Sequence, residues 1–115
     1  MKRVRYTTTC QVSDQPVRLT VTIGDAQMGA SRVRLDDDDV ATGSITDLVI
    51  GHGGAVSGRT LRIKTVVTDV NNKTNNTDVR YDLSGGRASL SFTLGAVVEE
   101  EGDSVIYLVD IELRA

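Results

Sequence analysis

The sequence predicts an all-β protein, an antiparallel two-sheet β-sandwich of about eight strands, and two observations support this prediction. Val and Ile together number 22 against nine Leu, beside 13 Thr, and these β-branched residues favour strands. Apolar and polar residues also alternate with period two along most of the chain, whereas no stretch shows the 3.6-residue period of a helix. Alternation with one polar side favours antiparallel sheets that each expose one face to water. A small β-barrel is the alternative architecture.

The length of 115 residues predicts one domain, residues 1–115, which is large enough to bury a core without disulfides or structural metals. No apolar stretch approaches the roughly 20 residues that a membrane-spanning helix needs. The number of strands is similar to that of immunoglobulin-like and C2-like sandwiches. Cys10 is the only cysteine and Trp is absent, so the disulfide and tryptophan of true immunoglobulin domains are missing and no motif identifies a family.

Four strands are expected in the N-terminal half, because aliphatic residues alternate there with Arg, Thr and Gln. Pro16 and the turn-forming pair Gly24-Asp25 separate the first three strands. Four successive aspartates predict an acidic loop over residues 36–43, and the glycine cluster 51–54 ends the fourth strand. These strands cover residues 3–12, 17–23, 32–35 and 45–50.

Four more strands are expected in the C-terminal half, where the alternation is more regular. The Asn-rich segment 71–76 predicts a turn, because Asn tolerates positive φ and hydrogen-bonds its own backbone. Gly85-Gly86 predicts the next turn, and residues 99–103 predict an acidic hairpin tip. These strands cover residues 61–68, 77–83, 88–94 and 105–113.

The chain carries 13 Lys and Arg against 16 Asp and Glu, and the net charge of −3 argues against a nucleic acid partner. The charge is unevenly distributed. Residues 1–35 hold six bases and two acids, a balance of +4, whereas residues 36–115 hold seven bases and 14 acids, a balance of −7. This asymmetry indicates either complementary patches on neighbouring copies or two solvated faces of one sheet protein.

The N-terminus is basic but lacks the apolar run of a secretory signal. A single cysteine, Cys10, forms no internal disulfide, which suits a reducing compartment. We therefore expect a cytoplasmic protein with no membrane span.

No motif predicts catalysis. Residues 53–60 nearly match the phosphate-binding pattern G-x-x-x-x-G-K-[ST], with Arg59 in place of Lys, but a strand follows instead of the helix that the motif requires. His52 lies between glycines and is expected to be exposed, whereas Cys10 is expected to be a buried, inert thiol. The spacing selects no pair of carboxylates for hydrolysis. We therefore expect no enzyme and no catalytic residue.

Oxygen-rich loops are the best candidate site, and calcium is the candidate ion, because it prefers carboxylate and carbonyl oxygens. The spacing of an EF-hand fails in both loops, so the alternative is solvated turn chemistry. If calcium binds, millimolar calcium should raise the melting temperature and EGTA should reverse the rise. The candidate ligands are Asp36, Asp37, Asp38, Asp39, Asp69, Asn71 and Asp78.

All four aromatic residues, Tyr6, Tyr81, Phe92 and Tyr107, fall at positions expected to point inward. Sugars usually stack on exposed aromatic platforms, so a carbohydrate partner is poorly supported.

Ile106 and Leu108 lie on the side of the last strand that is expected to face water, with Val66 nearby and Val97 or Val98 as further candidates. Outward apolar residues are typical of an interface, although a central strand covered on both sides is the alternative. We therefore expect a non-enzymatic binding or assembly module that contacts another protein or a second copy of itself. A calcium-dependent ligand-binding module and a carbohydrate-binding domain are the two alternatives.

Overall fold

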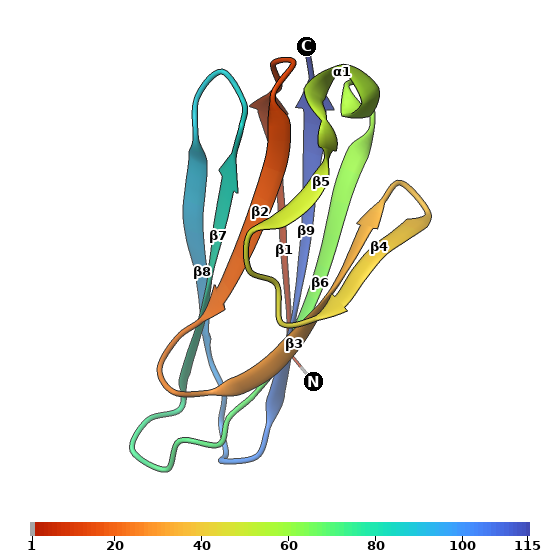
Figure 1. Ribbon diagram of the computed structural model, residues 1–115. Helices are drawn as coiled ribbons and strands as arrows, with labels where there is room; N and C mark the ends of the chain where they lie inside the picture. The colour runs from red at the N-terminus through yellow and green to blue at the C-terminus, as the bar shows by residue number, and fades with distance from the viewer. Residues whose placement is uncertain (1) are drawn as a thin grey trace.

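The computed structural model describes residues 2–115 and confirms the all-β fold. The strands form two facing sheets, an elongated β-sandwich of 44 × 24 × 20 Å, with the two chain ends at opposite ends of the molecule (Figure 1). The five-stranded sheet has the order β1-β9-β6-β3-β4, and the four-stranded sheet has the order β5-β2-β7-β8. The strands are β1 (Lys2–Gln11), β2 (Pro16–Ile23), β3 (Met28–Leu35), β4 (Asp38–Gly43), β5 (Leu48–His52), β6 (Thr60–Thr68), β7 (Asn76–Ser84), β8 (Leu90–Val97) and β9 (Ser104–Arg114).

The predicted alternation builds the core, because the inward residues of β6, β7 and β9 are buried between the sheets. Two buried tyrosines link the sheets through their hydroxyls. The Tyr81 hydroxyl donates to Thr65 Oγ1 at 3.2 Å, and the hydroxyls of Tyr107 and Thr77 lie 2.6 Å apart. Burial raises the pKa of Tyr81 to about 12 and also raises the pKa of Tyr107.

The expected acidic loop at residues 36–43 is wrong, because most of this segment forms β4. Only Asp36 and Asp37 make the turn between β3 and β4, and Asp38 and Asp39 already pair with β3. Asp36 has a φ of 52°, a left-handed conformation that Asp tolerates better than most residues and that suits a tight hairpin. The charged side chains point to solvent while their backbone continues the sheet, which brings the number of strands to nine.

One pairing departs from the expected antiparallel arrangement, since β1 pairs with β9 in parallel. Period-two alternation is the same in parallel and antiparallel strands, so it does not reveal direction. β1 is an edge strand, and for this reason Tyr6, expected to point inward, is 39% exposed. Its ring packs against Phe92 of β8, with centroids 4.7 Å apart.

A single-turn helix, α1 (Gly53–Val56), connects β5 to β6 where the sequence predicts a plain connection. Within residues 2–115, no helix has the length and apolar character needed to cross a membrane.

Candidate binding surface

The predicted calcium ligands form two groups at opposite ends of β6. Asp36 lies beside the first residue of β6, since its N–H donates to the carbonyl of Thr60 at 2.8 Å. Asp69 and Asn71 instead follow the last residue of that strand. Nine residues of strand span about 27 Å, so the two sets of oxygens do not share one ion.

Arginine side chains form ion pairs with the carboxylates of the β3–β4 turn. Arg59 is central, because its Nε contacts Asp36 and its Nη2 contacts Asp38, each at 2.8 Å. The hydrogen bond from Arg59 is the main reason that the pKa of the Asp36 carboxyl is lowered. This turn is therefore a network of ion pairs. The remaining pairs are Arg32–Asp39 at 2.8 Å and Arg62–Asp37 at 3.9 Å.

The β6–β7 loop holds Asp69 and Asn71, and Asp78 lies near the start of β7. Asn71 is engaged on both sides of its amide, since Nδ2 donates to the Asp25 carbonyl at 2.8 Å and Oδ1 accepts from the Lys73 N–H at 3.0 Å. Burial and the neighbouring Asp25 carboxylate raise the pKa of Asp78. Asp69 is fully buried, and no described group hydrogen-bonds either of its carboxylate oxygens. No three His, Cys, Asp or Glu side chains in residues 2–115 are placed to hold a metal ion, so calcium binding stays a prediction.

The predicted interface residues Val66, Ile106 and Leu108 come together on the outer face of the five-stranded sheet. β9 lies between β1 and β6, and Val66 is directly opposite Ile106. All three side chains are half-buried. Val97 and Val98 do not join them, because Val97 ends β8 in the other sheet and Val98 is buried.

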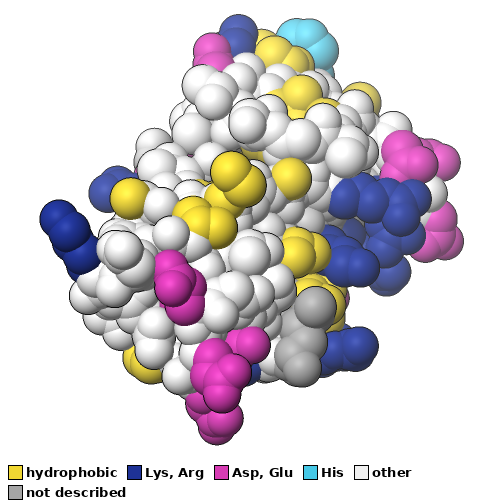
Figure 2. Space-filling view, turned by 90° about the horizontal axis from the view of Figure 1, so that it is seen from below, with side chains coloured by type: hydrophobic (Ala, Val, Ile, Leu, Met, Phe, Trp, Pro, Cys, Tyr) yellow, Lys and Arg dark blue, Asp and Glu magenta, His cyan; other side chains and the backbone are white. Residues whose placement is uncertain are grey.

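Six cations surround this apolar group, and none of them was among the predicted site residues. They occur as three pairs spaced two residues apart on β1, β6 and β3, so each pair projects from the same face. We call the six cations, together with Val66, Ile106 and Leu108, the basic face. The cations are Arg3, Arg5, Arg62, Lys64, Arg32 and Arg34. Figure 2 shows Lys and Arg side chains gathered along one side of the molecule, with acidic side chains beside them.

The strand register places like charges directly opposite one another on the basic face. Arg32 of β3 faces Lys64 of β6, and Arg34 faces Arg62. Like charges at directly opposed positions destabilise a strand pair. On their other sides, Arg34 faces Asp39 of β4 and Arg62 faces Asp110 of β9, so the pair of Arg32 and Lys64 is the less compensated one. Rules of this kind are most often broken at functional sites, which makes the four cations a candidate binding surface.

A shallow hollow of about 190 Å³ lies in the basic face. Four cations and one carboxylate surround it, so its local charge is positive and suits an anionic group. Its cations and the half-buried aliphatic side chain of Leu108 give it the character of a binding surface. The side chains at the hollow are Arg5, Arg34, Arg62, Lys64, Leu108 and Asp110.

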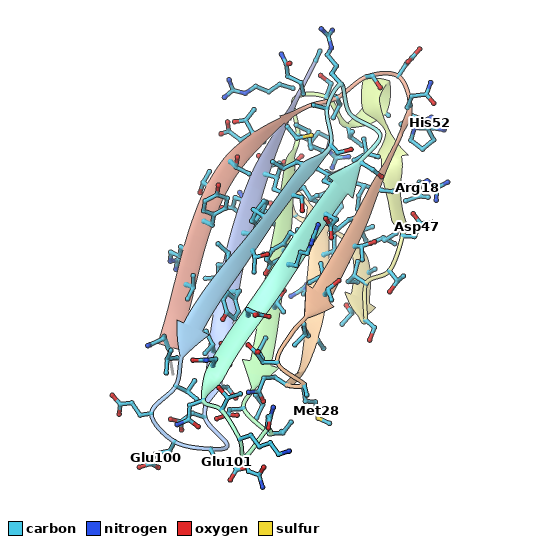
Figure 3. All side chains as sticks on the ribbon, turned by 90° about the vertical axis from the view of Figure 1, so that its left-hand side faces the viewer. Arg18, Met28, Asp47, His52, Glu100 and Glu101 are labelled. Carbon is cyan, nitrogen blue, oxygen red and sulfur yellow. The ribbon has the colours of Figure 1, made fainter. Side chains whose placement is uncertain are left out.

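The outer face of the four-stranded sheet differs because its arginines are neutralised. Arg18 pairs with Asp47 and Arg80 pairs with Asp82, each at 3.2 Å, and Figure 3 shows the first pair side by side. On the basic face, four of the six cations form no ion pair within residues 2–115. These four are Arg3, Arg5, Arg34 and Lys64.

The remaining candidates for chemistry lie apart from the basic face. Cys10 is buried on the inward side of β1, and burial raises the pKa of its thiol, as expected of an inert cysteine. His52 is exposed at the end of β5, as predicted. Tyr81 and Tyr107 are buried, which leaves no exposed pair of aromatic rings beyond the Tyr6–Phe92 contact among the described residues.

No protein family model, curated protein or solved structure matches this chain. The fold and the basic face define its class as a β-sandwich with a cationic, partly apolar sheet surface.

Proposed function

We propose that this chain is a non-enzymatic binding and assembly module, and that the basic face is the surface with which it binds another protein. The single observation that supports this function is the gathering of six cations, four of them without an ion pair within residues 2–115, around half-buried aliphatic residues. An acidic partner would neutralise these cations and reduce the repulsion where Lys64 faces Arg32.

The composition of the basic face also fits a protein interface. Arg is enriched at protein interfaces, because its guanidinium makes directed hydrogen bonds and its stem packs on apolar surface. Val66, Ile106 and Leu108 supply apolar surface, and burying this surface against a partner contributes favourable binding free energy. The cations around it supply orientation and a fast, salt-dependent association rate.

A photo-crosslinking amino acid at Thr7 tests this function in the cells that make the protein. Thr7 is exposed and lies opposite Asp110 on the outer face, beside the cations but not among them. We expect ultraviolet light to give one or a few discrete protein adducts, including any dimer of the chain, detected by immunoblot and mass spectrometry. The second variant Leu108→Asp should remove these adducts, because it places a charge in the apolar group.

Thr93 is the matched control, since it is also an exposed threonine but lies on the outer face of the four-stranded sheet. The proposal requires adducts at Thr7 and none of the same mass at Thr93. Absence of adducts at Thr7, or equal labelling at the two positions, contradicts it.

A further inference from the structure

We infer that the partner of the basic face is a second copy of this chain, and that the contact is made by the acidic end of the β8–β9 hairpin. This inference rests on the proposed function and names its partner. The acidic tip consists of Glu99, Glu100, Glu101 and Asp103.

Hydrogen bonds fix the shape of the acidic tip, and its carboxylates form no ion pairs within residues 2–115. The N–H of Glu100 donates to Asp103 Oδ2 at 3.2 Å, and the N–H of Gly102 donates to the carbonyl of Asp69 at 2.8 Å. The four acidic side chains are exposed, and none pairs with Lys or Arg within residues 2–115. Figure 3 shows Glu100 and Glu101 projecting from one end of the molecule. Because the turn is already ordered, little conformational entropy is lost when it binds.

A neighbouring basic residue, Lys2, does not neutralise the tip. It borders a second shallow hollow together with Glu99 and Asp103, but its ammonium donates to the carbonyl of Val97 at 2.7 Å. The tip therefore presents up to four negative charges within five residues, and the basic face presents four cations without ion pairs.

The tip cannot reach the hollow in the basic face of its own molecule. Asp110, which borders that hollow, lies seven residues along β9 from Asp103, a distance of about 23 Å in an extended strand. Arg3 lies opposite Ile106 and so closer to the tip, but it forms no ion pair within residues 2–115. Contact between the tip and the hollow thus requires two molecules. Because tip and face are different surfaces, the contact is heterologous and leaves a free tip and a free face at the ends, so further copies can add.

The strength expected of this contact is low and sensitive to salt. A five-residue turn covers less area than the roughly 1,200 Å² at which stable interfaces begin, so association is expected at high micromolar concentration. Its main attraction is between exposed charges, which 0.5 M salt screens beyond about 4 Å. The distribution of charge favours it, since the chain carries both signs in separate regions, whereas the net charge of −3 on each copy opposes it.

Sedimentation velocity and light scattering on the purified protein test the contact. At several hundred micromolar in 20 mM salt, we expect a weight-average mass at least 1.5 times the 12.4 kDa of the monomer, falling to the monomer value in 0.5 M salt. The tip variant Glu99→Lys with Glu100→Lys and Glu101→Lys gives the tip a net charge of +2, because only Asp103 remains acidic. The face variant Arg5→Glu with Arg62→Glu and Lys64→Glu leaves one cation, Arg34, against four carboxylates at the hollow. Each variant should remain monomeric in 20 mM salt. The combined variant, which carries all six changes, should associate again, because a basic tip then meets an acidic hollow.

The matched control is Asp14→Lys with Gln15→Lys, which adds three positive charges in the exposed β1–β2 turn. It should associate like the unaltered protein, and circular dichroism should show that every variant is folded. A monomeric unaltered protein, or a folded combined variant that stays monomeric, overturns the tip contact. In that case adducts at Thr7 with another protein would still support the basic face as a binding surface, whereas their absence would remove both proposals.

Discussion

Replacing Gly53 by alanine is expected to lower the free energy of unfolding by about 3 kcal/mol, because no space exists for a methyl group there. A Cβ at Gly53 would overlap the carbonyl oxygen of Ser13 in the β1–β2 turn. Neither side can move easily. The N–H of Gly53 donates to the Gln15 carbonyl at 3.1 Å, and the Ser13 hydroxyl donates to the carbonyl of Gly85 at 2.9 Å. Thermal unfolding followed by circular dichroism should show a melting temperature lower by on the order of 10 °C.

Gly54→Ala is the matched control, one residue further along α1. Gly54 is exposed, and nothing lies within 4 Å of a Cβ built there. Alanine favours helical backbone over glycine, so this variant should be equally stable or more stable by up to about 1 kcal/mol. Equal losses in the two variants would contradict the close approach of the β1–β2 turn to α1. The close packing at Gly53 also explains why glycine begins the spacing of residues 53–60 that resembles a phosphate-binding loop. At this position glycine is required by the packing of the backbone.

The period-two pattern was enough to predict the fold class and most of the strands. It failed at β4, where side-chain charge suggested a loop although the backbone of Asp38 and Asp39 remains in the sheet. It also failed for β1, because alternation does not encode direction and an edge position leaves Tyr6 partly exposed. Both failures depend on which strands are neighbours, and this follows from the tertiary packing rather than from the local sequence.

The candidate site was predicted only in part for the same reason. The alternation pattern predicts Ile106, Leu108 and Val66, because it places these apolar residues on the side of a strand that is expected to face solvent. The basic pairs were visible along the chain as Arg3-x-Arg5, Arg32-x-Arg34 and Arg62-x-Lys64. Each pair by itself is an ordinary solvated strand face. Only the order β1-β9-β6-β3 shows that the three pairs lie on one surface, and only the register shows that like charges oppose one another.

The buried carboxylate of Asp69 should make the protein less stable than it would be with a neutral side chain. Continued alternation beyond β6 points Asp69 inward in line with Thr65 and Val67, and the residue is fully buried. Its backbone is held firmly, because its N–H donates to the Asp103 carbonyl at 2.9 Å and its own carbonyl accepts from Gly102. Its two side-chain oxygens receive no hydrogen bond from any described residue. An ionised group buried without a partner costs more than a neutral one, since the solvation that it loses is not replaced.

Asp69→Asn keeps the shape and removes the charge, so the free energy of unfolding in urea at pH 7 should rise by about 1–3 kcal/mol. Asp14→Asn in the exposed β1–β2 turn is the control and should change it by less than about 0.5 kcal/mol. The same measurement distinguishes calcium binding. EGTA destabilises the unaltered protein only if a bound cation stabilises it. If EGTA lowers its free energy of unfolding and leaves that of Asp69→Asn unchanged, a bound cation neutralises this carboxylate. Asp69 is then identified as a calcium ligand. If Asp69→Asn is less stable than the unaltered protein in EGTA, the carboxylate makes a favourable interaction in the fold, and the cost assigned to its burial is wrong.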